Sequence, residues 1–295
     1  MSALSRPARL GLRSLALLYL AALLIVPVGL IFYRTFEHGL SAPIEAITSS
    51  DGLHAFWLTI VCVGIAVPLN TIFGVITALV LVRQDFRGKS LVNAVIDVPF
   101  AISPVIIGLA LFLVYAPRNS WFGGWLMDQG VQVIFSVPGM VLATIFVSLP
   151  FVVREVMPVL QEIGTDQEEA AETLGATPWQ TFWRVTLPAI RWGVSYGVVL
   201  ATARALGEFG AVSVVAGNIS GQTQTLPLFV RSQFDNLNLA GAYAAGIVLA
   251  ILAISVLFSM NLLQRRSARN AGGGDEDHEL PGPGVFVPQP IEKEA

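Results

Sequence analysis

Two charged side chains, Arg204 and Glu208, lie within a long apolar segment of the sequence. Because they are four residues apart, they share one face of a helix and are able to form an ion pair. A charge at the centre of a bilayer costs at least about 2.5–3.5 kcal/mol, so such residues normally face the interior of a helix bundle or water. Two interpretations follow: the pair joins helices, or Arg204 contributes positive potential to a path for an anion.

Ser103 is a further candidate for a position on such a path. It precedes Pro104 inside another apolar segment, where the proline interrupts the helix. The free N–H groups of a broken helix point toward an anion in some transport proteins. The simpler alternative is a kink that serves only helix packing.

Residue patterns typical of catalysis are missing from the sequence. It contains neither a GxxxxGK[ST] phosphate loop nor a GxGxxG turn, and none of His38, His54 and His278 belongs to an HExxH pair. Cys62 is the single cysteine, so no intrachain disulfide or cysteine-based metal site is available. A net charge of −3 argues against a nucleic-acid partner. We therefore expect no enzyme activity, and no cofactor or metal in this chain.

The loop between residues 154 and 191 has the pattern of two short helices. Thr165–Glu168 has the spacing of a capping box, and Gly175 is a typical helix end. Thr177–Gln180 directly afterwards has the same capping-box spacing, with a proline at the first helical position. Pro188 is expected to end this second helix. The prediction is a pair of helices joined by a bend at Gly175.

The first of these helices has a stripe of small and apolar residues beside acidic ones. Ala170, Ala171 and Leu174 form the stripe, and the acids are Glu168, Glu169 and Glu172. A helix that lies on lipid usually carries Lys and Arg on its polar face. The acids therefore favour a protein partner over the membrane surface.

This loop resembles the EAA loop of ABC importer permeases, EAA-x3-G-x9-I-x-LP. Glu169-Ala170-Ala171 is followed after three residues by Gly175, and after nine more by Val185-Thr186-Leu187-Pro188. Val185 replaces Ile and remains β-branched and apolar. In that family the loop is a coupling helix seated in a groove of the ATP-hydrolysing subunit. The residues that the resemblance assigns to coupling are Glu169, Ala170, Ala171, Gly175, Val185, Leu187 and Pro188.

Three further stretches narrow the resemblance to sulfate/thiosulfate permeases, and most of all to the W-type subunit of that family. They are residues 150–155, 204–211 and 221–228, of which 204–211 is also similar to molybdate permeases. The resemblance covers about residues 15–265. It implies four kinds of partner: a homologous T-type permease, two subunits that bind ATP and Mg²⁺, an external sulfate-binding protein, and membrane lipid.

The elements that position these residues are membrane helices. Charged residues make up 13% of the sequence, about half the roughly 25% of a soluble domain, whereas the AVILMFWYC set makes up 54%. A span needs about 20 mostly apolar residues. Six runs fit: Leu15–Phe32, Phe56–Val82, Val98–Ala116, Gly130–Val153, Trp192–Ala216 and Leu239–Leu263. The expected fold class is all-α, an integral membrane bundle of six transmembrane helices, and the resemblance adds a type I ABC importer permease-like arrangement with a cytoplasmic coupling helix.

The positive charges predict the orientation of these spans. Of 17 Lys and Arg residues, thirteen lie in the termini and in the loops after spans two and four, three lie on the other side, and Arg204 lies within the membrane. This bias places both termini in the cytoplasm of a bacterial inner-membrane protein. The predicted parts are a cytoplasmic N-terminus (1–14), a permease domain (15–265) and a disordered cytoplasmic tail (266–295).

The function expected is ATP-driven import of sulfate/thiosulfate-type oxyanions, with ATP hydrolysis in a partner subunit. A molybdate or tungstate permease is an alternative. An ion-coupled secondary transporter is a rival from another class, although such proteins typically contain internal repeats with ion sites at the midplane. We find no repeat here. A membrane-bound scaffold is the third possibility.

Overall fold

The computed structural model describes residues 6–37, 39–117 and 120–272, which form helices and no strands. In chain order the elements, including two π-helical turns, are α1 Arg6–Leu20, η1 Ala21–Ile25, α2 Val26–Phe36, α3 Ser41–Thr48, α4 Ser50–Arg83, α5 Lys89–Ala101, α6 Pro104–Tyr115, α7 Gly123–Asp128, α8 Val137–Ile163, α9 Asp166–Thr173, α10 Pro178–Thr181, η2 Phe182–Thr186, α11 Leu187–Leu206, α12 Gly210–Val215, α13 Leu226–Asp235 and α14 Leu239–Gly272. The all-α prediction is confirmed for this part of the chain.

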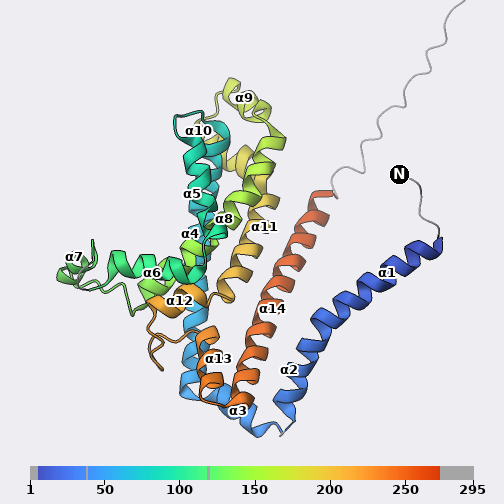
Figure 1. The fold of residues 1–295 in the computed structure, drawn as a ribbon. Helices are drawn as coiled ribbons and strands as arrows, with labels where there is room; N and C mark the ends of the chain where they lie inside the picture. The colour runs from blue at the N-terminus through green and yellow to red at the C-terminus, as the bar shows by residue number, and fades with distance from the viewer. Residues whose placement is uncertain (1–5, 38, 118–119, 273–295) are drawn as a thin grey trace, which may run out of the picture.

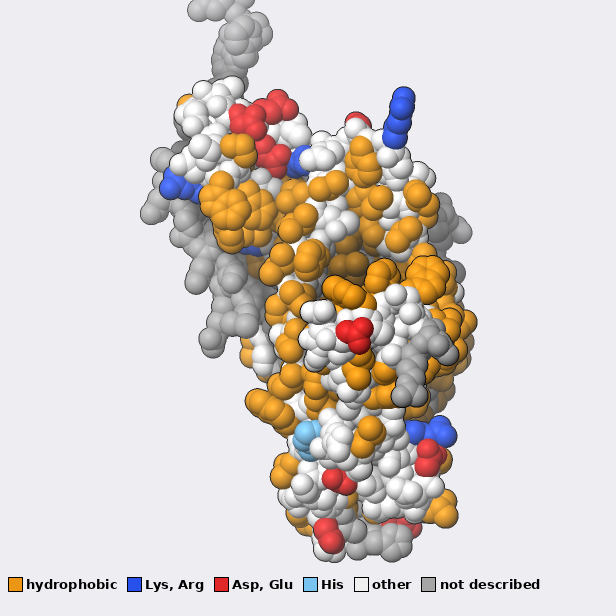
Figure 2. Space-filling view, turned by 90° about the vertical axis from the view of Figure 1, so that its left-hand side faces the viewer, with side chains coloured by type: hydrophobic (Ala, Val, Ile, Leu, Met, Phe, Trp, Pro, Cys, Tyr) orange, Lys and Arg blue, Asp and Glu red, His pale blue; other side chains and the backbone are white. Residues whose placement is uncertain are grey.

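Helix α8 is the centre of the bundle. It packs against α4 on one side and α11 on the other, whereas α14 lies beside α2, α3 and α13 (Figure 1). Helices α9 and α10 lie at one end of the molecule, and α3 and α13 lie at the opposite end. The face of the molecule seen in Figure 2 is apolar over most of its middle, and its acidic side chains gather mainly near the two ends. Such a surface suits a bilayer as solvent.

Glycines allow α4, α8 and α11 to approach closely. A Cβ atom on Gly74 of α4 would lie 2.7 Å from Cβ of Val152 in α8, and one on Gly197 of α11 would lie 2.8 Å from its Cα. Association of helices in lipid depends on such close packing, because burial of apolar surface supplies little driving force there. Val152, fully buried between the two glycines, therefore marks the tightest part of the bundle.

Gly74→Ala is expected to destabilise the protein by about 1–3 kcal/mol, because the added methyl overlaps with the side chain of Val152. Gly64→Ala in the same helix is the matched control, since nothing lies within 4 Å of its added Cβ. Thermal unfolding in detergent measures both. Equal melting temperatures for the two variants would contradict the close contact at Gly74.

Two of the predicted spans are broken rather than continuous. Val98–Ala116 is divided between α5 and α6, which meet at an angle of 114° around Ile102 and Ser103. Trp192–Ala216 is divided between α11, which ends at Leu206, and the short α12. Helix α6 packs along α12, and a Cβ on Gly210 would lie 2.8 Å from Cβ of Pro104. The two breaks therefore support each other.

Two other helix boundaries differ from the predictions. Helix α8 begins only at Val137, so the first residues of the run Gly130–Val153 lie outside it. Pro188 does not end a helix, because α10, η2 and α11 run without a break from Pro178 to Leu206 and Pro188 lies in the first turn of α11, directly after the π-helical turn η2.

Four helical segments in the described ranges are long and apolar enough to cross a membrane: Leu10–Phe36, Ser50–Arg83, Val137–Ile163 and Leu239–Ser259. The bent pair α5–α6 makes a fifth if it counts as one span. Six spans stay a prediction. Helix α1 begins at Arg6 and α14 continues to Gly272, while residues 273–295 of the predicted disordered tail lie outside the described residues.

Candidate functional site

The loop between α8 and α11 contains the two predicted short helices, α9 and α10. Gly175 joins them with φ of +83°, the left-handed region that disfavours side chains with a Cβ. The capping box of the second helix is confirmed: Thr177 Oγ1 accepts from the Gln180 N–H, and the Thr177 N–H donates to Gln180 Oε1 at 2.9 Å. The bend at Gly175 is thus fixed by local chemistry on both sides.

The prediction of a capping box at Thr165–Glu168 is wrong. The Thr165 side chain makes no capping hydrogen bond, and its Oγ1 donates instead to Glu169 Oε1 at 2.7 Å. Glu168 is unavailable as a reciprocal cap, since its carboxylate binds two side chains from other elements. Tertiary contacts therefore replace the local cap.

The predicted coupling residues divide into an exposed half and a packed half. Glu169, Ala170 and Gly175 are exposed, Ala171 is partly exposed, and the neighbouring Leu174 is 89% exposed. Val185, Leu187 and Pro188 lie at the junction of η2 and α11, where Val185 is half-buried and Leu187 packs against the core between α4, α8 and α11, although Pro188 itself is exposed. Leu187 thus joins one end of the motif to the bundle, while Glu169, Ala170 and Gly175 remain at the surface.

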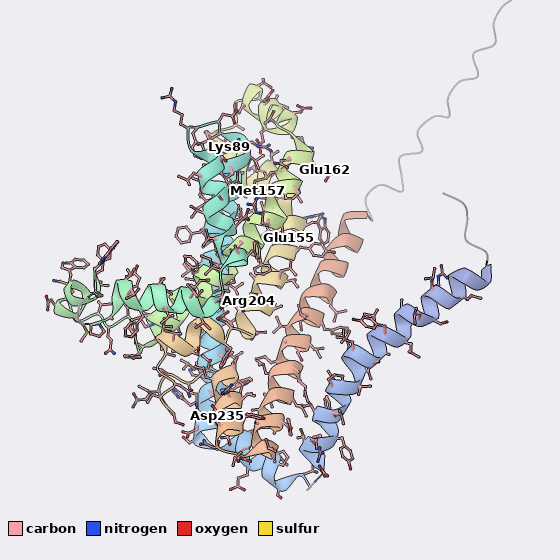
Figure 3. All side chains as sticks on the ribbon, viewed as in Figure 1. Lys89, Glu155, Met157, Glu162, Arg204 and Asp235 are labelled. Carbon is pink, nitrogen blue, oxygen red and sulfur yellow. The ribbon has the colours of Figure 1, made fainter. Side chains whose placement is uncertain are left out.

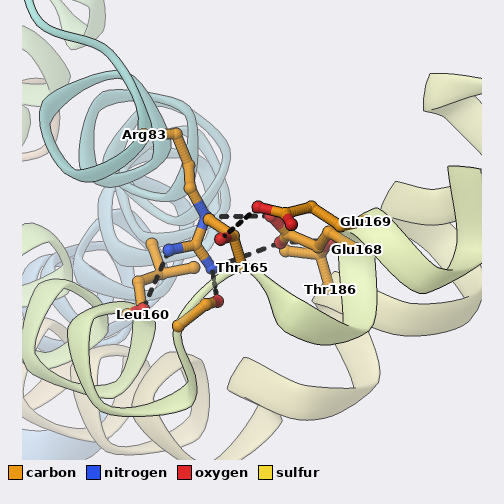
Figure 4. Close-up of polar contacts among 7 residues, drawn as sticks. Arg83, Leu160, Thr165, Glu168, Glu169 and Thr186 are labelled. Atoms are coloured by element: carbon orange, nitrogen blue, oxygen red, sulfur yellow. Dashed lines mark hydrogen bonds and ion pairs between the residues drawn. The ribbon is translucent and has the colours of Figure 1, made fainter.

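The carboxylate of Glu168 connects α9 to α4 and to η2, the turn directly before α11 (Figure 4). Arg83 Nε lies 2.9 Å from Glu168 Oε2, as an ion-pair contact without regular hydrogen-bond geometry, and Nη2 donates to Oε1 at 3.3 Å. Thr186 Oγ1 donates to the same Oε1 at 2.8 Å. Sequence reasoning missed this contact, because the two residues are 85 positions apart and no local pattern pairs them.

Arg204 and Glu208 form the predicted ion pair, near mid-height of the molecule (Figure 3). Arg204 Nη1 lies 2.5 Å from Glu208 Oε2, a contact that lacks regular hydrogen-bond geometry. The pair does not lie on one continuous helix, since α11 ends at Leu206. Glu208 Oε1 accepts from the Ala211 N–H at 2.7 Å and so caps α12. The carboxylate is therefore both an ion-pair partner and a helix cap.

A second ion pair crosses between α5 and α8. Arg154 donates from Nε to Asp97 Oδ1 at 2.8 Å and from Nη2 to Oδ2 at 2.6 Å, a bidentate contact. Arg154 Nη2 also donates to the Asn93 carbonyl at 3.3 Å. The sequence offered no signal for this pairing, because the two residues are 57 positions apart.

Ser103 lies at the break between α5 and α6 but makes no capping hydrogen bond with its side chain. Its carbonyl accepts from the N–H groups of Ile106 and Ile107. The break brings Pro104 beside Gly210, two residues from Glu208, so the elements that carry Ser103 and Glu208 are neighbours. Within the described residues, no hydrogen bond joins Ser103 itself to Arg204 or Glu208. No group of three or more His, Cys, Asp or Glu in those residues is placed to hold a metal ion.

Solved structures define the class of this fold. The chain is similar to a protein in the crystal structure of a bacterial alginate ABC transporter in complex with its alginate pentasaccharide-bound periplasmic protein. The TM-score is 0.73 at 18% identity, over 88% of this chain and 94% of the other. The two chains therefore share a fold over nearly their whole length.

The chain belongs to the family described as binding-protein-dependent transport system inner membrane component, which matches residues 70–269. It is 51% identical over 257 residues (87% of this chain, 93% of the relative) to the sulfate transport system permease protein CysW of Synechocystis. Identity to the Escherichia coli K12 CysW protein is 45%, over 93% of this chain and 96% of the relative. Identity to the CysT protein of the same strain is 38%, over 88% and 93%. The resemblance to W-type permeases is confirmed.

Proposed function

We propose that this chain is the W-type permease subunit of an ATP-driven importer that carries sulfate/thiosulfate-type oxyanions into the cell. The observation that carries the proposal is the 51% identity to a sulfate permease subunit over 87% of the chain. The alginate transporter, at 18% identity, supports the fold alone. Sulfate is thus favoured over molybdate or tungstate.

ATP and Mg²⁺ belong to two partner subunits, because this sequence contains no phosphate loop. The exposed half of the motif around Glu169, Ala170 and Gly175 contacts an ATPase subunit, where small side chains allow close approach. The packed half, with Leu187 against the core, passes movement of that subunit to α11. This division of the motif is what a coupling element requires.

The remaining partners are a T-type permease and an external sulfate-binding protein. Both termini are cytoplasmic, on the same side as α9. The excess of Lys and Arg on that side supports this orientation. The beginning of α1 and the end of α14 also both point toward the end of the molecule that carries α9 and α10 (Figure 1).

Reconstitution of the complex in vesicles tests the function. Uptake of radioactive sulfate is expected to need ATP on the α9 side and the binding protein on the other, and thiosulfate is expected to compete better than molybdate. The isolated chain is expected neither to bind nor to hydrolyse ATP. Uptake driven by an ion gradient without ATP would instead identify a secondary transporter, and stronger competition by molybdate would reassign the substrate.

A further inference from the structure

Five residues from four parts of the chain meet beneath the loop helices, and we call them the Arg83 cluster: Arg83, Leu160, Gly164, Glu168 and Thr186 (Figure 4). Arg83 is the last residue of α4, and Glu168 belongs to α9. Their side chains are only 17% and 19% exposed. The cluster is therefore a largely enclosed junction, unlike an ion pair on an open surface.

Arg83 binds the end of α8 as well as Glu168. Nη1 donates to the Leu160 carbonyl at 3.0 Å, and Nη2 donates to the Gly164 carbonyl at 2.6 Å. The last carbonyls of a helix lack partners within it, and a cation there also matches the helix dipole. One guanidinium thus joins the ends of α4 and α8 to α9.

Glu168 extends the junction to the start of α11. Its Oε1 accepts from the hydroxyl of Thr186, which is buried in η2 directly before α11. Glu168 is the residue before the motif glutamate Glu169, which is exposed and bonds only to Thr165 among the described residues. The two adjacent acids thus have different environments: Glu168 is turned toward the bundle, and Glu169 is turned toward the surface.

We propose that Arg83 is a positioning residue that fixes α9 on the bundle through Glu168, so that a displacement of α9 moves α4, α8 and α11 together. The part of this inference that concerns transport rests on the proposed coupling function of α9. Only the planar fork of arginine, with five N–H donors, reaches two carbonyls and a carboxylate at once, and a lysine presents a point charge instead. A test variant should therefore change the shape of the Arg83 side chain and keep its charge.

The first experiment measures how firmly α9 is held on the bundle in the purified full chain, and it does not depend on whether the chain transports sulfate. Arg83→Lys and Glu168→Gln are each expected to speed hydrogen exchange of the α9 amides about tenfold, with the centre of α8 unchanged. Arg87→Lys and Glu172→Gln are the matched controls, because both residues are exposed and neither side chain forms a hydrogen bond or ion pair within the described ranges. Unchanged exchange in α9 would overturn the proposal.

The second experiment measures sulfate transported per ATP hydrolysed in the reconstituted complex. Each single variant is expected to assemble normally and to lower this ratio by about 5- to 150-fold, the usual range for coupling between sites. The double variant is expected to be no worse than the more severe single one. If the losses of the two single variants multiply in the double variant, or if the single variants keep a normal ratio of sulfate transported to ATP hydrolysed, the proposed role of Arg83 is refuted. Absence of ATP-dependent uptake by the unmodified complex would instead refute the proposed function.

Discussion

Arg204→Ala is expected to cost about 3–5 kcal/mol of stability, because it leaves a buried carboxylate without its counter-charge. The side chain of Glu208 is 2% exposed, so water does not replace the lost guanidinium. In the described part of the chain, the Ala211 N–H, 2.7 Å from Oε1, is the one donor that this carboxylate retains. Thermal unfolding in detergent and the yield of assembled complex measure the loss.

Glu208→Gln is expected to be milder, about 1–3 kcal/mol, for two reasons. The amide oxygen still accepts from Ala211, and Arg204 is 28% exposed and reaches water. In the double variant no buried charge is left, so its loss is expected to be clearly smaller than the sum of the single losses. Strict additivity would mean that the two residues do not interact.

Arg204→Lys separates pairing from a role on the anion path. It retains the charge but lacks the planar fork. If Arg204 only pairs with Glu208, sulfate uptake keeps its apparent affinity while stability falls slightly. If Arg204 contacts the anion, apparent affinity changes while stability stays close to that of the unmodified protein.

Gly175→Val is expected to lower coupled transport about 5- to 30-fold while leaving assembly of the permease intact. Its φ of +83° costs a side chain with a Cβ roughly 1–2 kcal/mol, and β-branched residues are least tolerated there. Nothing lies within 4 Å of an added Cβ, so the effect comes from the backbone and not from a clash. The measurement is sulfate uptake together with ATP hydrolysis in reconstituted vesicles.

Gly175→Asn is the matched control, because asparagine adopts the left-handed region more readily than other residues with a Cβ. It is expected to retain most of the uptake. If the valine variant transports with normal stimulation of ATP hydrolysis, the bend at Gly175 has no part in coupling. If the asparagine variant is as poor as the valine variant, the side chain itself disturbs the docking surface and backbone strain is not the cause.

Features that depend on neighbours in the sequence were predicted well. The bend at Gly175 and the cap formed by Thr177 and Gln180 involve residues at most three positions apart, so their side chains and backbone meet in any context. The Thr165 cap failed for the opposite reason. Its partner Glu168 binds Arg83, 85 positions away, and that enclosed ion pair outweighs a local hydrogen bond.

The path of the membrane segments was predicted less well. An apolar run is long enough to span the bilayer whether it is straight or bent, since composition carries no information on direction. The break at Ser103 was foreseen from Pro104, but its 114° angle depends on α12, which lies against α6. The end of α11 at Leu206 depends on Glu208, which caps the next helix instead of continuing the first.

The sequence by itself determined that this is a membrane protein, that the loop between residues 154 and 191 bends at Gly175, and that Arg204 pairs with Glu208. Each of these follows from composition or from residues a few positions apart. Only the tertiary structure decided that Glu169 is exposed, that Glu168 is held by Arg83, and that Arg154 pairs with Asp97. Those choices depend on groups 57 to 85 positions apart in the chain, which become neighbours only after the helices have packed.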